Sequence, residues 1–147
     1  MDSKKLAATV LCVDPTKDLV LAVSRKDNPI AMGLPGGKLD TGESYKQAAA
    51  REFTEETGYG VDPKDLIYVY GTGKDDTGYS VATFLLPFKF WNPIKQETLA
   101  VHETGVVRWV PWQTLFDGPY GSYNKALYLE VADKLQKLNG IGGEQDE

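Results

Sequence analysis

The sequence predicts an α/β fold in which helices lie on either side of a mixed sheet. Two observations predict it: five apolar segments of strand length, and two segments with helical signals placed among them. The chain has 147 residues, of which 41% are hydrophobic, so it is about one domain and can bury a sizeable core. We expect a single domain over residues 1–140, followed by a disordered acidic tail at 141–147.

The strands are predicted from runs rich in Val, Ile, Tyr and Phe that lie between turn residues. The first two runs are separated by the turn Asp14-Pro15-Thr16-Lys17. The fourth run is long and contains Pro87, which indicates an edge strand or a bulge. The predicted strands are 6–13, 19–24, 66–72, 79–90 and 106–110, with a polar turn at 73–78 and a loop at 91–104.

The first helix is predicted over 44–57 by signals at both of its ends. Ser44 and Gln47 form a Ser-x-x-Gln capping box, so Ser44 is the expected N-cap. Gly58 is the expected left-handed stop at the C-terminus, and no proline or glycine interrupts the helix. A second, amphipathic helix is predicted over 124–138, because its apolar residues recur at spacings of 4, 4 and 3.

Four glutamates and one arginine stand at fixed spacing in and before the first helix. Glu52, Glu55 and Glu56 fall within an arc of about 100° at 3.6 residues per turn. Arg51 precedes Glu55 by four residues and can brace it, and Glu43 lies just before the helix. Carboxylates this crowded raise one another's pKa unless cations neutralise them. The segment therefore predicts a divalent-metal site.

The segment 34–38, Leu-Pro-Gly-Gly-Lys, precedes the helix and is predicted to be a glycine-rich turn. Paired glycines allow positive φ and the close approach of an ion or a ligand. The carbonyl of Gly36 is thus a candidate metal ligand, and Gly37 and Lys38 are candidate substrate contacts. Ligands that are all oxygens favour Mg²⁺, for which Mn²⁺ can substitute.

The stretch from Gly37 to Tyr59 resembles the Nudix box, written G-x5-E-x7-R-E-U-x-E-E-x-G-U, where U is a bulky apolar residue. Every position is filled without a gap, although Tyr59 is aromatic where the family usually has an aliphatic residue. The filled positions are Gly37, Glu43, Arg51, Glu52, Phe53, Glu55, Glu56, Gly58 and Tyr59. The resemblance extends over about residues 4–138 and implies the Nudix α/β/α sandwich with a mixed central sheet.

What the resemblance implies is hydrolysis of a nucleoside diphosphate linked to another moiety. It assigns roles by position in the box, with metal ligands and residues that orient them. The implied ligands of Mg²⁺ are Glu52, Glu55, Glu56 and the Gly36 carbonyl, and the implied orienting residues are Glu43 and Arg51. Water attacks a phosphorus in this chemistry, and a carboxylate takes its proton.

The general base varies within the family, being either a box glutamate or one on a later loop. Glu103 stands six residues before Trp109, in the place where MutT-like members carry such a loop glutamate. We favour Glu52 and Glu103 jointly, with Glu97 as the competitor of Glu103. An ordinary surface carboxylate is the alternative interpretation of Glu103.

Features outside the box bear on the substrate. Arg25, at the end of the second strand, is a candidate phosphate or sugar contact, or else a solvated charge. Asn124 stands where MutT-like proteins place an asparagine that reads a purine edge, and it is equally suited to cap a helix. Aromatic candidates for stacking on a base are Tyr68, Tyr70, Tyr79, Trp91, Tyr120 and Tyr123.

These features favour a MutT-like nucleoside triphosphate pyrophosphohydrolase, which releases a nucleoside monophosphate and pyrophosphate. An ADP-ribose or nucleotide-sugar pyrophosphatase is the alternative. A catalytically silent module that senses nucleotides is an alternative of another class, although such modules tend to lose box glutamates and all are present here.

Charge and composition narrow the expected partners to small molecules. The formal net charge is −5 and the isoelectric point is near 4.9, which suits neither nucleic acid nor an anionic membrane. Cys12 and His102 are the only residues of their kinds and lie far apart, so zinc is not indicated and no internal disulfide can form. With no signal peptide or spanning segment, a cytoplasmic location is expected. Nudix proteins are often dimers, so a homodimer stays open.

Overall fold

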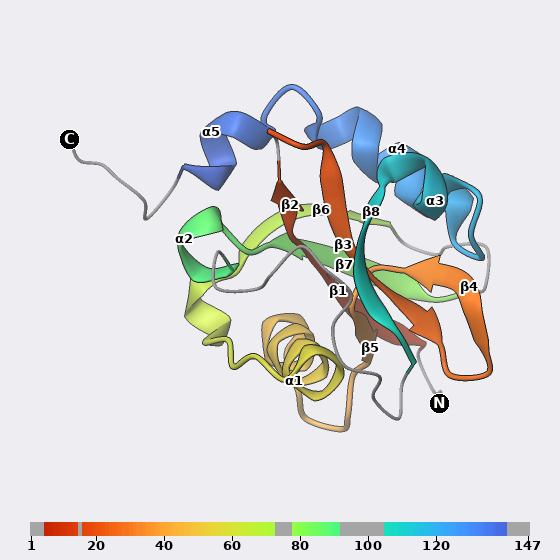
Figure 1. Cartoon of the computed structure of the whole chain (residues 1–147). Coiled ribbons are helices and arrows are strands. Elements are labelled where there is room, and N and C mark those ends of the chain that lie inside the picture. The colour runs from red at the N-terminus through yellow and green to blue at the C-terminus, as the bar shows by residue number, and fades with distance from the viewer. Residues whose placement is uncertain (1–4, 15, 73–77, 92–104, 141–147) are drawn as a thin grey trace.

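A computed structural model describes residues 5–14, 16–72, 78–91 and 105–140, and the fold is given for these. Two sheets lie between helices, with α1 on one side and α3, α4 and α5 on the other (Figure 1). The expected α/β arrangement with helices on both sides of a mixed sheet is confirmed. The helices are α1 Tyr45–Thr57, α2 Phe88–Trp91, α3 Trp112–Phe116, α4 Gly121–Val131 and α5 Leu135–Asn139, with a short 3-10 helix at Pro63–Asp65.

The first sheet is mixed and has the strand order β5-β1-β7-β6. β1 and β7 pair in parallel over their full length, from Leu6 opposite Ser80 to Leu11 opposite Leu85, and the other two pairings are antiparallel. Its strands are β1 Leu6–Leu11, β5 Gly36–Lys38, β6 Ile67–Thr72 and β7 Ser80–Leu85.

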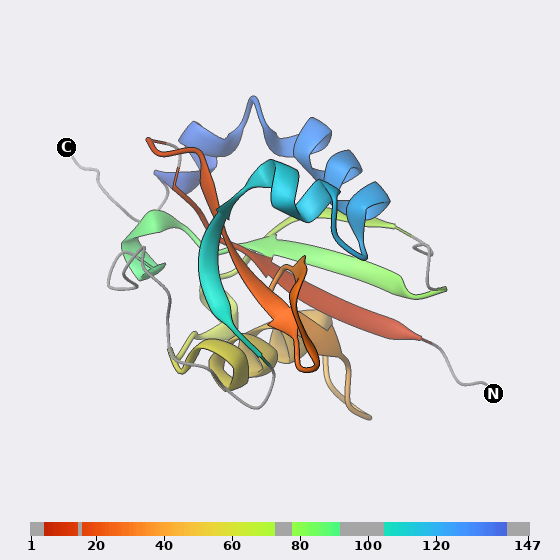
Figure 2. The same cartoon turned by 45° about the vertical axis from the view of Figure 1, so that its right-hand side comes forward.

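The second sheet is antiparallel and centres on β3, which pairs with β2, β4 and β8. The predicted strand 6–13 therefore divides between two sheets, because the chain leaves the first sheet after Leu11 and enters the second at Val13. Figure 2 shows the two sheets meeting where β1 and β3 cross. The strands are β2 Val13–Asp14, β3 Leu19–Arg25, β4 Asn28–Gly33 and β8 Val107–Pro111.

The prediction of one long strand over 79–90 is wrong. The strand β7 ends at Leu85, and α2 begins at Phe88. Pro87 marks neither an edge nor a bulge, since β7 lies inside the sheet between β1 and β6. Proline has no N–H to donate to a ladder, so it stands past the end of the strand instead. The irregular pairing is on β6, between Tyr68 and Tyr70.

The prediction of one helix over 124–138 is also wrong. The helix α4 begins at Gly121 and ends at Val131, and α5 follows only from Leu135. The apolar stripe hides the break, because Leu127, Val131 and Leu135 are all buried on the same core whether or not the helix is continuous. Asn124 lies inside α4, where its N–H donates to the Tyr120 carbonyl at 2.9 Å, so it is not an N-cap.

Two strands were missed by the sequence analysis, β4 and β5. The segment predicted as a glycine-rich turn contains β5, which pairs with β1 and sets Gly36 opposite Thr9. The pairing needs glycine, because a Cβ at Gly36 would lie 2.7 Å from the Thr9 Cα. The sequence of β4 shows no apolar run of strand length, because the first three residues of the strand are exposed. The predicted turn at 73–78, the loop at 91–104 and the tail lie largely or wholly outside the described residues.

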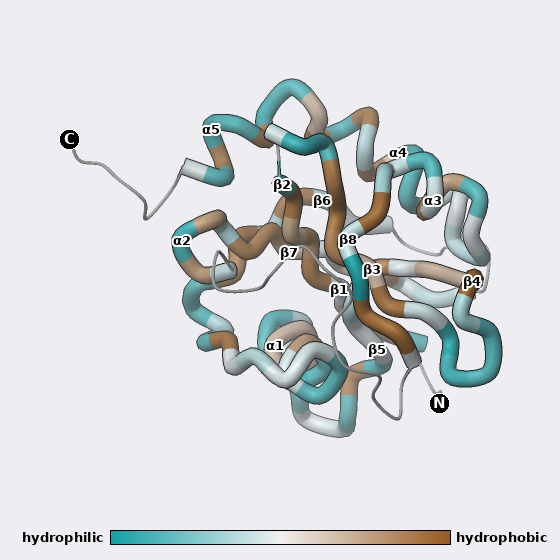
Figure 3. The backbone as a smooth tube through the Cα atoms, in the orientation of Figure 1, coloured by the Kyte–Doolittle hydropathy of each residue, from teal (hydrophilic) through white to brown (hydrophobic). Residues whose placement is uncertain are grey.

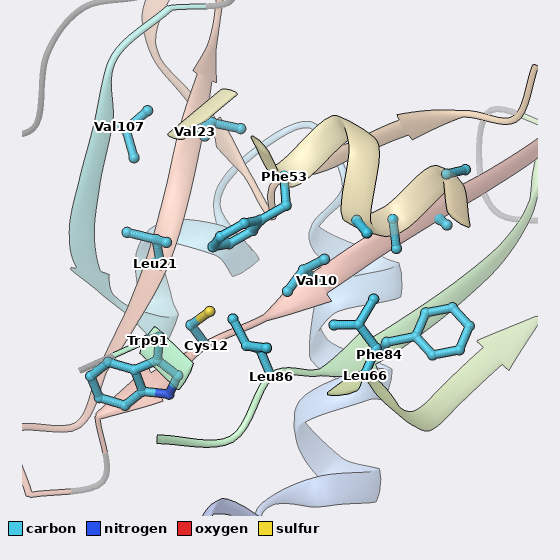
Figure 4. Close-up of a cluster of buried hydrophobic side chains, with 14 of the residues drawn as sticks. Val10, Cys12, Leu21, Val23, Phe53, Leu66, Phe84, Leu86, Trp91 and Val107 are labelled. Carbon is cyan, nitrogen blue, oxygen red and sulfur yellow. The ribbon is translucent and has the colours of Figure 1, made fainter. Parts of the chain in front are cut away.

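The core consists of two apolar clusters on opposite sides of the sheets. In the first, Phe53 of α1 projects toward Val10 of β1 and Leu21 of β3 (Figure 4). The second lies beneath α3 and α4 and includes Leu115 and Leu127. Figure 3 shows hydrophobic segments concentrated in the central strands and hydrophilic ones at the β3–β4 turn and between α4 and α5. Among the described residues, no helix is both long and apolar enough to span a membrane.

Candidate active site on helix α1

The helix α1 begins and ends where local sequence signals place it. The Ser44 hydroxyl accepts from the Gln47 N–H at 3.1 Å, and the Gln47 side chain accepts from the Ser44 N–H at 2.9 Å. Gly58 ends the helix in the left-handed conformation, with φ 82°. On the inner face, Ala49 and Phe53 are fully buried. Fixed ends and a buried face together determine where the glutamates of α1 point.

Arg51 ties the helix to the segments before it. Its Nε and Nη2 donate to the two carboxylate oxygens of Glu43 at 2.7 and 2.9 Å, and Nη2 also donates to the Lys38 carbonyl at 3.1 Å. The hydrogen bonds from Arg51 lower the pKa of Glu43 to about 2, and the Glu43 carboxylate raises the pKa of Arg51. Glu43 and Arg51 therefore form a permanently charged clamp between β5 and α1.

Glu56 is the most buried carboxylate of the group, with 7% of its surface exposed. Its Oε1 accepts from the Gly36 N–H at 2.8 Å, which joins α1 to β5. Burial raises the pKa of Glu56 to about 8, although the hydrogen bond from Gly36 opposes this. Without a cation nearby, this carboxyl group is therefore largely protonated at neutral pH.

Glu52 and Glu55 are the more accessible members. Burial raises the pKa of Glu52 and the neighbouring Arg51 opposes the shift, while the Glu55 side chain is 54% exposed. Arg51 Nη1 contacts Glu52 at 3.2 Å and Glu55 at 3.4 Å. Gly37 leaves room for Glu52, since an added Cβ would lie 2.5 Å from its carboxylate carbon.

The donor set fits a hard divalent cation. It consists of oxygens alone, and a cation beside Glu56 would return that carboxyl group to its charged form. Within the described segments, no three acidic, histidine or cysteine side chains already gather around one point. Arg51 holds Glu52 and Glu55 instead, so an ion would compete with Arg51 for both carboxylates.

Two cavities border Gly36, the residue whose N–H donates to the Glu56 carboxylate. The first, of about 330 Å³, lies over the first sheet and is bounded by β1, β5, β7 and α4. Asn124 lines it and is only 2% exposed, and its Nδ2 has no hydrogen-bond partner among the described residues. Three of the aromatic candidates line this cavity, namely Tyr79, Tyr120 and Tyr123.

The second cavity, of about 640 Å³, is more open and more polar than the first. Arg25 at the end of β3 and Lys26 and Asp27 of the β3–β4 turn line it, and Glu56 stands in its wall. The two cavities share Gly36 together with Leu34 and Tyr120. They are therefore neighbours, and the Gly36 that lines both donates its N–H to the buried Glu56 carboxylate.

The structure brings six of the eleven predicted site residues to these two cavities, while Glu43, Arg51, Glu52 and Glu55 line neither. Gly36, Gly37, Lys38 and Asn124 line the first cavity, and Gly36, Arg25 and Glu56 line the second. Glu103 and its competitor Glu97 lie outside the described residues. The sequence analysis did not single out Thr9, which lines the first cavity, or Lys26, which lines the second, because a threonine in a strand or a lysine in a turn carries no signal of its own.

Comparisons with known proteins agree on one family. The family model described as NUDIX domain matches residues 3–130. A Bacillus subtilis protein named "Putative 8-oxo-dGTP diphosphatase" is 51% identical over 51 residues, which are 35% of this chain and 34% of that protein. A Methanocaldococcus jannaschii protein named "ADP-ribose pyrophosphatase" is 36% identical over 66 residues, 43% of this chain and 39% of that protein. The matches span little more than a third of these relatives.

Solved structures share the fold. A MutT NUDIX hydrolase from Burkholderia pseudomallei superposes with a TM-score of 0.62 at 19% identity, covering 88% of this chain and 99% of that one. A bifunctional NMN adenylyltransferase/ADP ribose pyrophosphatase from Francisella tularensis gives a TM-score of 0.65 at 20% identity, covering 92% of this chain and 42% of that one. At such identities the likeness concerns the fold alone.

Proposed function

The chain belongs to the Nudix family, and from that premise we propose that it is a metal-dependent pyrophosphohydrolase of nucleoside diphosphate derivatives. One observation carries the proposal: a buried glutamate, Glu56, lines the second cavity and accepts from the N–H of Gly36, which lines both cavities, and the same helix carries Glu52 and Glu55. A nucleoside fits the smaller, more enclosed cavity, and a phosphate chain fits the open cavity lined by Arg25 and Lys26.

The residues that would hold Mg²⁺, or Mn²⁺ in its place, are Glu52, Glu55, Glu56 and the Gly36 carbonyl. When bound, the ion neutralises phosphate oxygens and makes water a better nucleophile. Glu56 is held toward β5 by the Gly36 N–H. Arg51 and Glu43 fix the orientation of the helix relative to β5.

Proton transfer is assigned to a carboxylate. Burial raises the pKa of Glu52, which brings its carboxylate closer to the strength that a general base needs at neutral pH. The oxygen of the attacking water would bond to phosphorus, and Glu52 would accept a proton from that water. The bond between phosphorus and the anhydride oxygen would break, and the leaving oxygen would take the bond electrons. We retain Glu103 as the joint candidate on the later loop.

For the substrate we propose a nucleoside triphosphate, split to a nucleoside monophosphate and pyrophosphate. Asn124, whose buried Nδ2 has no hydrogen-bond partner in the described part of the chain, supports a polar base in the first cavity, and the cations Arg25 and Lys26 support terminal phosphates in the second. The name of the Bacillus subtilis relative agrees with this choice. An ADP-ribose or nucleotide-sugar pyrophosphatase is the second candidate, since the second cavity also has room for a sugar and the archaeal relative bears that name.

The decisive experiment is a substrate panel with Mg²⁺ and identification of the products. Pyrophosphate from a nucleoside triphosphate supports the first candidate. A sugar phosphate together with a nucleoside monophosphate supports the second. Tight binding of a nucleotide without turnover of any panel member contradicts the enzyme and favours a sensing module.

The variant Asn124→Ala tests whether the base binds beside Asn124 in the first cavity. Loss of the buried amide should change the ratio of kcat/KM between bases by about tenfold, because one well-made pair of hydrogen bonds discriminates bases by ~1–3 kcal/mol. Maximal rate should change less. An equal effect on every base would show that Asn124 serves α4 packing only.

We propose that the protein acts in the cytoplasm, as a monomer or as a homodimer. The one cysteine, Cys12, is buried and unpaired, which supports a reducing compartment. Sedimentation of the purified protein distinguishes the two states of assembly.

A further inference from the structure

We infer that the ring of Tyr120 packs against the sugar of the substrate, at the boundary between the two cavities. This inference rests on the proposed function, because it assumes that the base binds in the first cavity and the phosphates in the second. It gives Tyr120 a contact with substrate and no part in proton transfer or metal binding.

The boundary is formed by the residues that line both cavities, namely Leu34, Gly36 and Tyr120. A nucleotide with its base in one cavity and its phosphates in the other places its sugar beside these three. Leu34 is only 8% exposed and Gly36 has no side chain, so neither offers a ligand much contact surface. Tyr120 is 37% exposed, so its side chain provides most of the surface at the boundary.

The register of β1 and β5 shows which end of the first cavity adjoins the second. Thr9 is opposite Gly36 in this antiparallel pair, and Ala7 is opposite Lys38. All four residues line the first cavity, and of these four Gly36 alone lines the second as well. The second cavity therefore adjoins the Gly36 end, and the base lies farther along, toward Ala7 and Lys38.

The ring of Tyr120 is available to a ligand. The other two aromatic residues of the first cavity have partners, since Lys5 Nζ lies 5.7 Å from the centre of the Tyr79 ring and the rings of Tyr123 and Tyr70 are 5.4 Å apart. Within the described part of the chain, the Tyr120 side chain makes no hydrogen bond, ion pair or ring contact. A ligand can therefore cover this ring without displacing such a partner.

The position of Tyr120 is set by two elements. The residue stands directly before α4, and its carbonyl accepts from the Asn124 N–H at 2.9 Å. Its ring lies close to Gly33 at the end of β4, where an added Cβ would be 3.1 Å from the ring carbon Cδ2. A side chain that is already held in place loses little conformational freedom when a ligand binds.

The contact that this ring offers is apolar. A sugar carries C–H groups as well as hydroxyls, and a flat aromatic ring can cover those C–H groups. Burial of their surface stabilises the complex in proportion to the area covered. The contact needs the ring of Tyr120 and not its hydroxyl.

Three probes separate the parts of a nucleotide: adenosine monophosphate, ribose 5-phosphate and inorganic phosphate. The second probe lacks the base, and the third lacks the sugar as well. NMR titration of the whole chain with Mg²⁺ gives the three Kd values without need of turnover. For Tyr120→Ala we expect the Kd of the first two probes to rise alike by about fivefold, the effect of losing roughly 40 Å² of buried apolar surface. The Kd of phosphate should stay within about twofold, because phosphate does not reach the ring.

Tyr120→Phe is the matched variant, since it keeps the ring and removes only the hydroxyl. All three of its Kd values should stay within about twofold of those of the unmodified chain. A loss in Tyr120→Phe as large as that in Tyr120→Ala overturns the packing of the ring against the sugar.

Other outcomes also overturn the sugar contact while leaving the proposed function standing. One is a Tyr120→Ala variant that binds adenosine monophosphate more weakly but ribose 5-phosphate unchanged, because the ring would then touch the base. Another is an equal loss for phosphate, which would show a general disturbance of the site. A third is an unmodified chain that hydrolyses the nucleotide panel but binds ribose 5-phosphate no more tightly than phosphate. If that chain binds none of the probes and hydrolyses no panel member, the sugar contact and the proposed function fall together.

Discussion

At the scale of single residues, the site depends on carboxylates held in unlike surroundings. Glu43 is paired with Arg51 and keeps its charge down to about pH 2, whereas burial raises the pKa of Glu56 to about 8. The first carboxylate can only orient its neighbours, because its charge is already neutralised by the guanidinium. The second is largely protonated when no cation is near, and a cation beside it would restore its charge, so its protonation responds most to metal binding.

Glu56→Gln should abolish most activity while leaving the fold intact. The amide oxygen can still accept from the Gly36 N–H, so the link between α1 and β5 is kept, but the charge needed beside a metal is lost. We expect a fall in kcat of at least about 100-fold and no stabilisation by Mg²⁺ in a thermal melt. Near-normal turnover would remove Glu56 from the metal site.

The metal-free protein should lose stability as the pH rises from about 4.5 to about 8. Over this window folded Glu56 keeps a proton that the unfolded chain has released, so raising the pH lowers the free energy of unfolding. This residue alone contributes up to about 1.4 kcal/mol per pH unit. Urea melts in a chelator at several pH values measure the slope, and Glu56→Gln should reduce it. An unchanged slope in that variant would assign the effect elsewhere.

At the scale of elements, the position of α1 depends on its caps and on the strand β5, which the sequence did not predict. Ser44 and Gly58 fix where the helix starts and stops. The strand β5 then brings Gly36 to Glu56 and the Lys38 carbonyl to Arg51, so two hydrogen bonds set the helix against the first sheet. The glycines of β5 are required for this approach, because a side chain at Gly37 would collide with Glu52.

Ser44→Ala should lower the free energy of unfolding by ~1 kcal/mol, the usual cost of losing an N-cap side chain, because the Ser44 hydroxyl accepts from the Gln47 N–H. Equilibrium urea unfolding measures the change. Ser44→Thr is the matched control, since it keeps the capping hydroxyl and should stay close to the unmodified chain. Equal losses in the two variants would mean that the cap does not stabilise α1.

At the scale of the whole molecule, the strands that cross the middle are buried on both faces. Along β3, Leu21 and Val23 belong to the cluster under α1, while Val20 and Ala22 belong to the cluster under α3 and α4. A strand buried on both faces has no polar alternation, which is why residues 19–23 form a continuous apolar run. The two clusters share these strands, so we expect the domain to unfold as one unit.

The rate at which the Cys12 thiol is modified measures that unfolding. Cys12 is fully buried, and burial raises the pKa of its thiol, so a thiol reagent should reach it only when the molecule opens. Modification in native buffer should be at least about 1,000-fold slower than in denaturant, because opening the core costs several kcal/mol. Rapid modification in native buffer would contradict tight packing of the first cluster, to which Cys12 belongs.

The sequence by itself determined α1, its caps and the face that carries Glu52, Glu55 and Glu56, because these depend on residues at most a few positions apart. It also determined the outline of the fold from apolar runs of strand length. The tertiary structure alone decided that Gly36 would meet Glu56, that Asn124 would lie buried inside α4 rather than cap it, and that Thr9, Thr83 and Tyr123 would align. Those contacts join residues from separate elements, and only packing of the two sheets against the helices brings such residues within hydrogen-bond reach.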